Sequence, residues 1–227
     1  MPRPYIKKNL AIDREGTRIT KDELETMGII PVDHPIPIYG ERLSYFIAGP
    51  PGCGKSTTAA EIISLFPRMP VFLFTDLSED DRAFRGLPIR KMKMELSLLK
   101  ELTPELLLSE GSCWVIFDDI DKIRDKNINK ALVDLMDNII ANGRNHGKGQ
   151  INVIATSHSL ADYRKTKYTI ENSEYWVIFP NKTIRSQLLT LLKKMSLEKM
   201  DIFDQDRVFI HHSVPLFIAT DSFISLI

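Results

Sequence analysis

Residues 49–56 read Gly-Pro-Pro-Gly-Cys-Gly-Lys-Ser, and this stretch matches the pattern G-x-x-x-x-G-K-[ST]. The glycines of such a loop let the backbone wrap closely enough for its N–H groups to point at phosphate oxygens. The side chain of Lys55 can reach the β- and γ-phosphates, and the hydroxyl of Ser56 can ligate Mg²⁺. The sequence therefore predicts that the chain binds a nucleoside triphosphate together with Mg²⁺.

The whole loop and the residue after it are expected to surround the phosphates. These residues are Gly49, Pro50, Pro51, Gly52, Cys53, Gly54, Lys55, Ser56 and Thr57. The helical pattern that follows would add the partial positive charge of its N-terminus. We interpret Cys53 as a small filler at a variable position and not as a nucleophile. The alternative, a Gly/Pro-rich turn with an unrelated lysine, is disfavoured because an apolar strand and a helical pattern flank the motif.

A second candidate site follows the apolar run of residues 113–117, which leads directly into Asp118 and Asp119. In open α/β sheets, ligands bind at the carboxyl ends of the strands. We predict that Asp118 holds Mg²⁺, directly or through water, and that Asp119 polarises the water that attacks the γ-phosphate. The alternative is that two acidic residues simply begin the next turn.

A third polar group closes the apolar run of residues 151–155, where the chain continues as Thr156, Ser157 and His158. A polar side chain here would sense the γ-phosphate if this strand lies between the first strand and the acidic one. Ser157 is the candidate for that catalytic role. The alternative is a strand terminus that becomes polar without contacting the ligand.

Strand-length apolar runs alternate with helical patterns along the chain, and this alternation predicts the elements that must position these groups. The runs are 43–48, 71–75, 113–117, 151–156 and 175–179. Runs that are apolar on both faces suit strands covered on both sides. The predicted fold is α/β, with a mainly parallel sheet, helices on both faces, and a C-terminal β-hairpin, formed by residues 207–211 and 215–220, added at one edge of the sheet.

Helices are expected from apolar stripes and caps. Ile128, Leu132, Leu135 and Ile139 form one stripe, and Ile184, Leu188, Leu191 and Met195 form another. Thr103 followed by Pro104 predicts a helix start. In the N-terminal region, Thr20 with Glu23 predicts a short helix that ends at Gly28. We therefore divide the chain into an N-terminal extension, residues 1–41, and a nucleotide-binding domain, residues 42–227.

Composition narrows the class of protein. The chain has 227 residues, 43% of them hydrophobic, with 30 Lys and Arg against 30 Asp and Glu, which excludes a mainly disordered chain. Its 2 cysteines rule out a disulfide framework or a four-cysteine zinc site. No apolar run approaches the ~20 residues of a membrane-spanning helix, and no secretory signal is recognisable. We expect a reducing, cytoplasm-like compartment, and any DNA contact must be local because the net charge is zero.

Three passages resemble the additional-strand P-loop ATPases: GPPGCGKST (49–57), CWVIFDDID (113–121) and ANGRNHGKGQINVIATSH (141–158). Within that group the chain resembles the FtsK–HerA superfamily, and particularly the genome-packaging ATPases of large double-stranded DNA viruses, of the poxvirus type. The resemblance covers roughly residues 40–220. This chain departs from the family pattern at two positions: many relatives have Glu at the position of Asp119, and the usual residue at the position of Ser157 is Gln.

The resemblance implies a sheet in which the strand of residues 151–156 lies between the first strand and the acidic one. It also implies a homo-oligomeric ring of five or six subunits that moves double-stranded DNA with ATP, in the host cytoplasm or associated with the virion. A capsid or portal-vertex protein would be a further partner. An arginine of one subunit would complete its neighbour's site; Arg144 is the first candidate and Arg164 the second. The alternative for Arg144 is a surface residue near a helix end.

A local basic run is the candidate contact for DNA in such a ring. It holds Arg82, Arg85, Arg90, Lys91 and Lys93, and a second run near Lys122 is interleaved with acidic residues. Several copies of a modestly positive loop would line one pore and hold phosphates without reading the base sequence. A solvated surface is the equally weighted alternative.

Other functions remain open at this point. An AAA+-type helicase or clamp loader would add an α-helical lid with a sensor arginine, whereas this tail has the pattern of strands. A nucleoside or small-molecule kinase would need an Arg-rich lid and an acceptor pocket. A GTPase would need N-K-x-D, which the string at Asn181 lacks. A nucleotide-binding scaffold without activity is disfavoured by the presence of Lys55, Ser56 and both acids.

Overall fold

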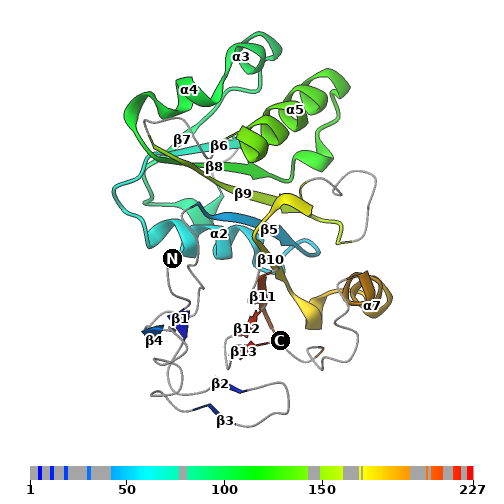
Figure 1. The fold of residues 1–227 in the computed structure, drawn as a ribbon. Helices are drawn as coiled ribbons and strands as arrows, with labels where there is room; N and C mark the ends of the chain where they lie inside the picture. Colours follow the sequence, from blue (N-terminus) through cyan, green and yellow to red (C-terminus); the bar gives the residue numbers. More distant parts are fainter. Residues whose placement is uncertain are drawn as a thin grey trace. The chain divides into compact units, whose positions relative to one another are not determined.

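The computed structural model divides the chain into two compact units, which are described separately (Figure 1). One unit is Ser44–Ser173, and the other joins Met1–Leu43 with Glu174–Ile227. The residues whose structure is described are 5–6, 11–12, 18–19, 30–31, 42–76, 81–142, 149–160, 169, 171–194, 203, 206–211, 217–220 and 224–226.

A parallel sheet forms the centre of the unit Ser44–Ser173. Its strands are β5 (Ser44–Ala48), β6 (Val71–Thr75), β7 (Ile89–Lys91), β8 (Cys113–Asp118) and β9 (Ile151–Ser157). Their order across the sheet is β5-β9-β8-β6-β7, and each neighbouring pair is parallel. The α/β fold is thus confirmed, and β9 lies between the first strand and the acidic strand, as the resemblance implied (Figure 1).

The strands β5, β6, β8 and β9 are buried along their whole length, which explains why they are apolar on both faces. Trp114, Tyr45, Phe74 and Phe117 are among the largest fully buried side chains. The rings of Phe74 and Phe117 stack with centroids 5.2 Å apart and an interplanar angle of 10°. Aromatic packing between β6 and β8 therefore holds the acidic strand in place.

Two helices pack against this sheet. Helix α2 (Lys55–Ser64) contacts β5 and β9, and α5 (Lys126–Asn142) contacts β9. The predicted stripe on α5 is buried at Leu132, Leu135 and Ile139. The Asp125 side chain caps this helix by accepting from the N–H groups of Asn127 (2.8 Å) and Ile128 (3.1 Å).

Shorter elements connect the strands. They are η1 (Arg82–Phe84), α3 (Leu96–Glu101), α4 (Pro104–Leu107), η2 (Leu108–Glu110) and η3 (Ile120–Lys122). The predicted helix start is confirmed, because the Thr103 hydroxyl accepts from the N–H of Leu106 at 3.3 Å. This helix, α4, ends after one turn and continues as η2.

The second unit carries antiparallel strands. They are β10 (Tyr175–Ile178), β11 (Val208–His211), β12 (Phe217–Thr220) and β13 (Ile224–Leu226). The antiparallel pairing of β11 with β12 confirms the predicted hairpin, but its predicted place at an edge was wrong, because β11 also pairs with β10 and β12 also pairs with β13. Short strands from the N-terminal region complete the unit: β2 (Ala11–Ile12) pairs with β13 and with β3 (Arg18–Ile19), while β1 (Tyr5–Ile6) pairs with β4 (Ile30–Pro31).

The described residues of this unit also form η4 (Pro180–Lys182) and α7 (Arg185–Lys194). On α7, Leu188 and Leu191 are buried as predicted, but Ile184 precedes the helix and is 66% exposed, so its place in the stripe was wrong. Met195 and the helix predicted from Thr20 to Gly28 lie outside the described residues. None of the helices in the described parts of the chain combines the length and the apolar character needed to cross a lipid bilayer.

The packing of Phe117 against Phe74 yields a test of the fold. We expect Phe117→Ala to lower the free energy of unfolding by about 3–5 kcal/mol, because it removes a fully buried ring and leaves a cavity. Leu106→Ala, at a side chain that is 54% exposed, should change it by less than about 0.5 kcal/mol. Denaturant titration of each variant measures both values, and equal losses would contradict the packing described.

Candidate functional site

The loop of residues 49–54 connects the end of β5 to α2. The N–H of Gly49 donates to the carbonyl of Ser157 at 3.1 Å, so the start of the loop is tied to the end of β9. The N–H of Cys53 donates to the carbonyl of Pro50 at 3.3 Å. Gly52 and Gly54 have φ values of 75° and 112°, which favour glycine. A β-carbon on Gly52 would meet nothing within 4 Å, so the backbone angle, and not lack of space, favours glycine there.

Lys55 begins α2 and turns back over this loop. Its side chain is only 6% exposed, and Nζ donates to the carbonyls of Gly49 (3.0 Å) and Pro50 (3.5 Å). Nζ also lies 3.9 Å from Oδ1 of Asp119. A buried ammonium therefore connects the glycine-rich loop with the acidic end of β8, although the two are far apart in the sequence.

Asp118 is the more buried of the two acids, at 3% exposed. Its Oδ1 accepts from the Thr156 hydroxyl at 2.9 Å, and its Oδ2 accepts from the Thr75 hydroxyl at 3.2 Å. Burial raises the pKa of the Asp118 carboxyl, the hydrogen bond from Thr156 opposes this rise, and the negative charge of Asp119 adds to it. A divalent cation would relieve this destabilisation of the charged carboxylate.

The residues present fit Mg²⁺ and a triphosphate. Mg²⁺ usually takes one or two protein ligands and fills its remaining positions with phosphate oxygens and water. Asp118 offers a buried carboxylate, and Ser56 offers a half-buried hydroxyl in the first turn of α2. These roles of Ser56 and Asp118 stay predictions.

Asp119 is the single non-glycine residue with a positive φ, 49°, in the described part of the chain. Aspartate tolerates this left-handed conformation better than most residues. Its Oδ1 accepts from the Thr156 hydroxyl at 3.2 Å, its N–H donates to the same hydroxyl at 2.9 Å, and its Oδ2 is hydrogen-bonded to Nε2 of His158. The turn at Asp119 thus brings two consecutive carboxylates to one hydroxyl, which an unbroken strand would not do.

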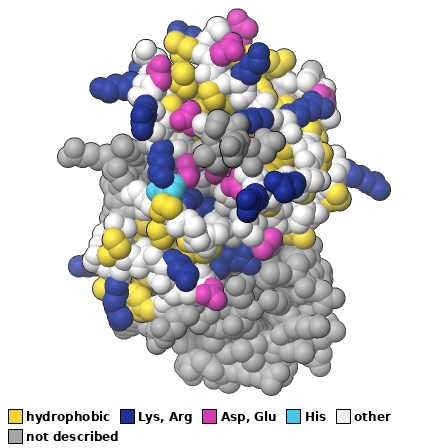
Figure 2. All heavy atoms as spheres, turned by 180° about the vertical axis from the view of Figure 1, so that it is seen from behind, with side chains coloured by type: hydrophobic (Ala, Val, Ile, Leu, Met, Phe, Trp, Pro, Cys, Tyr) yellow, Lys and Arg dark blue, Asp and Glu magenta, His cyan; other side chains and the backbone are white. Residues whose placement is uncertain are grey.

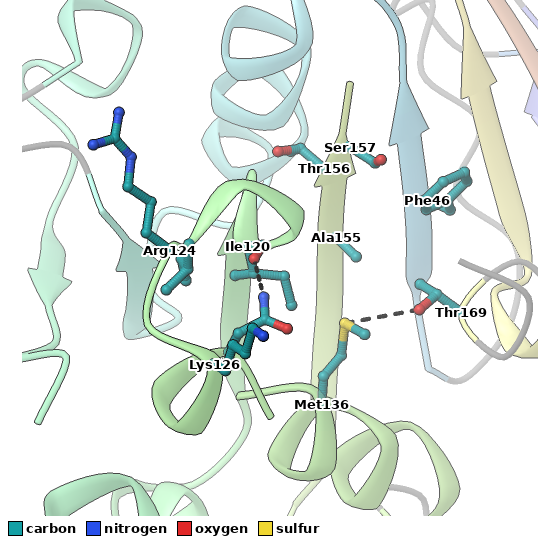
Figure 3. A pocket seen from close by; sticks show the side chains of 11 residues that line it. Phe46, Ile120, Arg124, Lys126, Met136, Ala155, Thr156, Ser157 and Thr169 are labelled. Carbon is teal, nitrogen blue, oxygen red and sulfur yellow. Dashed lines mark hydrogen bonds between the residues drawn. The ribbon is translucent and has the colours of Figure 1, made fainter. Parts of the chain in front are cut away.

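Thr156 is a residue that the sequence did not single out. Its hydroxyl contacts both acids, whereas the prediction had singled out Ser157. The Ser157 hydroxyl donates to the carbonyl of Ser159 at 3.2 Å and accepts from its N–H at 3.1 Å. Figure 3 shows Thr156 and Ser157 pointing to opposite sides of β9, as consecutive strand residues do. The catalytic role of Ser157 stays a prediction.

Among the described residues, cavities adjoin these strand ends. One, of about 380 Å³, includes Thr156, Ser157, Arg124 and Lys126 in its lining (Figure 3). Another, of about 280 Å³, lies at the ends of β6, β7 and β8. Its polar lining residues are Thr75, Asp81, Arg85, Lys91 and Asp118. Two cations of the predicted DNA-contacting run therefore line the same cavity as the predicted metal ligand.

The other cations of that run differ in their surroundings. The Arg90 guanidinium binds both carboxylate oxygens of Glu110, at 2.5 and 2.8 Å, and Lys93 lies 4.0 Å from Glu95. Arg82 is exposed. Figure 2 shows positive and negative side chains interspersed over the described part of one face. Arg144 and Arg164, the predicted trans-acting arginines, lie outside the described residues.

The comparison with protein families shows a match over residues 45–169 to the ATPase family associated with various cellular activities (AAA). Among curated proteins, an uncharacterized protein, V3, from Sputnik virophage is 31% identical over 157 residues, which is 65% of this chain. The matched region spans 59% of V3. The matched family region contains the loop, both acids and the end of β9.

Solved structures show the same fold. The pCW3 conjugation coupling protein TcpA superposes with a TM-score of 0.54 and 12% identity, over 84% of this chain and 61% of TcpA. The cytoplasmic domain of the type VII secretion ATPase EccC from Thermomonospora curvata superposes with a TM-score of 0.52 and 13% sequence identity, over 93% of this chain and 28% of EccC. These likenesses confirm a P-loop ATPase fold.

The two cysteines offer a test of nucleotide binding that does not depend on turnover. Burial raises the pKa of the Cys53 thiol, and the positive charge of Lys55 opposes this rise. Burial also raises the pKa of the Cys113 thiol, to about 12. Near neutral pH, we expect iodoacetamide to label Cys53 more slowly than an exposed cysteine and Cys113 only after unfolding.

Adding ATP with Mg²⁺ should slow the labelling of Cys53 further, because the loop would close around the phosphates. Mass spectrometry of the labelled chain reads both sites, and a Cys53→Ser variant isolates the signal of Cys113. Labelling of Cys53 at the same rate with and without nucleotide would contradict the predicted contact.

Proposed function

We propose that this chain, which belongs to the ATPase family associated with various cellular activities (AAA), is a Mg²⁺-dependent motor that hydrolyses ATP to move duplex DNA, in the packaging of a viral genome. The observation that carries the proposal is the convergence of three segments at one point. Nζ of Lys55 lies 3.9 Å from Oδ1 of Asp119. The Thr156 hydroxyl is hydrogen-bonded to the carboxylates of both Asp118 and Asp119.

Hydrolysis needs the groups that meet there. Lys55 would neutralise charge on the β- and γ-phosphates, Ser56 and Asp118 would hold the metal, and Asp119 would orient the attacking water. Ser157 remains a candidate sensor on the opposite side of β9. We further propose a ring of five or six copies in which an arginine, with Arg144 as first candidate, stabilises charge in the neighbour's site.

The proposal of duplex DNA as the track is supported by charge and by position. Arg82 and Arg85 are exposed, and Arg85 with Lys91 lines the cavity that also contains Asp118. A phosphate backbone that draws these cations outward would change the electrostatic field at the metal ligand, which links DNA contact to hydrolysis. Arg90 and Lys93 would contribute less, because Glu110 and Glu95 lie against them.

The proposal of a viral role, with a capsid or portal-vertex protein as partner, is supported by the resemblance of the sequence to packaging ATPases. The virophage origin of the similar protein V3 also favours it. We place this activity in the host cytoplasm or on the virion.

A DNA-dependent ATPase of the AAA+ helicase or clamp-loader type is the second candidate, and the match to the AAA family model favours it. That match ends at residue 169, before the antiparallel strands β10–β13. A loader would instead be expected to add a helical lid in this part of the chain. Movement along duplex DNA without a clamp or helicase partner would distinguish the motor from the loader.

The roles of Lys55 and Asp119 separate binding from chemistry. We expect Lys55→Ala to weaken ATP binding and to lower turnover by more than about 100-fold. Asp119→Asn should keep ATP affinity within about threefold while turnover falls by a similar factor, because the amide is a poor acceptor for the water proton. Calorimetric binding and phosphate release measure the two properties, with Lys100→Ala as an exposed control; near wild-type turnover in Asp119→Asn would remove its proposed role.

DNA coupling is tested by turnover with and without duplex DNA, alongside the molar mass in solution. We expect a ring whose ATPase is stimulated by DNA, and we expect Arg82→Ala/Arg85→Ala to reduce this stimulation about 10-fold while basal turnover is measured in parallel. Arg90→Ala should have a smaller effect, because Glu110 already binds this guanidinium. Stimulation that equals the wild-type value in the double variant would exclude these residues as the contact.

A further inference from the structure

His158, directly after β9, makes a contact that neither the motif nor the proposed chemistry accounts for. Its Nε2 is hydrogen-bonded to Oδ2 of Asp119. The imidazole is 17% exposed and the carboxylate 29%. A mostly buried ring therefore touches the side chain to which we assign the orientation of the attacking water.

The Asp119 carboxylate is held on both of its oxygens. On one side, Oδ1 lies 3.2 Å from the Thr156 hydroxyl and 3.9 Å from Nζ of Lys55. On the other side, Oδ2 has the imidazole of His158. Two anchors on different oxygens fix the rotation of the carboxylate plane, which one anchor alone would leave free.

The direction of the hydrogen bond follows from the groups involved. An ionised carboxylate only accepts, so Nε2 of His158 carries the proton and donates it. The other ring nitrogen, Nδ1, is buried and has no hydrogen-bond partner among the described residues. Within that part of the chain, the contact with Asp119 is thus the polar interaction that orients the ring.

We propose that His158 is a positioning residue that holds the Asp119 carboxylate in the orientation needed to accept a proton from the attacking water. The inference rests on the proposed ATP hydrolysis and not on DNA movement. Without the Nε2–H donor, Oδ2 loses the partner described above, whereas Nζ of Lys55 still lies 3.9 Å from Oδ1. A carboxylate that turns towards Lys55 pairs with the charge meant for the phosphates and no longer faces the water.

Three substitutions at position 158 separate this role from simple packing. The amide nitrogen of Gln occupies nearly the place of Nε2 of histidine, whereas that of Asn occupies nearly the place of Nδ1. His158→Ala and His158→Asn should therefore lower kcat about 10- to 100-fold, as the loss of a supporting hydrogen bond typically does. The KM for ATP should stay within about twofold, because the loss is confined to the chemical step. His158→Gln should recover most of the turnover.

The measurements are steady-state hydrolysis of Mg-ATP by the full chain, which gives kcat and KM, and single-turnover hydrolysis, which isolates the chemical step. ATP affinity and thermal melting are recorded for every variant. Wild-type rates in His158→Ala would overturn the inference. Turnover of His158→Gln as slow as that of His158→Ala would also overturn it. A glutamine donates a hydrogen bond but cannot take a proton, so this result would indicate that the imidazole itself is the base.

A double-mutant cycle adds an independent readout. If His158 acts through Asp119, then adding His158→Ala to Asp119→Asn should cost less than about twofold further. Fully additive losses would overturn the inference. Absence of hydrolysis in the wild-type chain, with and without duplex DNA, would instead sink the proposed function, whereas wild-type hydrolysis with unaffected His158 variants would sink this inference alone.

Discussion

The parallel pairing of β9 between β5 and β8 is the constraint on which the site depends. On one side Ala48 lies opposite Ser157, and on the other Phe117 lies opposite Ala155. This register brings three strand ends to one edge of the sheet, so that the loop after β5 and the acids after β8 both meet the last residues of β9. A shift of one residue would turn the Thr156 hydroxyl to the other face and separate it from both carboxylates.

Charge burial sets the second constraint. Asp118 and Lys55 are almost fully buried, and Asp119 carries a second negative charge beside them. Hydroxyl donors from Thr75 and Thr156 offset part of the cost for Asp118, but burial still raises the pKa of its carboxyl. A site of this kind is stabilised by a ligand that brings both a divalent cation and negative phosphate oxygens, which is the composition of Mg-ATP.

The sequence predicted β5, β6, β8 and β9 well because they are buried on both faces, so their apolar runs are continuous and their ends are marked by polar residues. It missed β7, which is short and includes the exposed side chains of Arg90 and Lys91. It also predicted the loop of residues 49–54 between β5 and α2, while the contact of this loop with phosphates stays a prediction. It did not identify Thr156, because a run of polar residues at a strand end does not reveal which of two neighbours points towards the acids; the pleat decides this. Nor could it show that Arg90 is paired with Glu110, twenty positions away, since that contact depends on how β7 and η2 are brought together.

The left-handed turn at Asp119 explains why a histidine has a place in this site. Asp119 has a φ of 49°, so the chain departs from strand geometry directly after Asp118. The carboxylate of Asp119 therefore lies against the Thr156 hydroxyl, which Asp118 also contacts. Its backbone is held there by the hydrogen bond from its N–H to Thr156. The carboxylate, however, stands close to Lys55, and Coulomb attraction favours a tighter pair with that ammonium. A donor on the opposite oxygen counteracts this attraction, and His158, one residue beyond the end of β9, is placed by the same strand register to supply it.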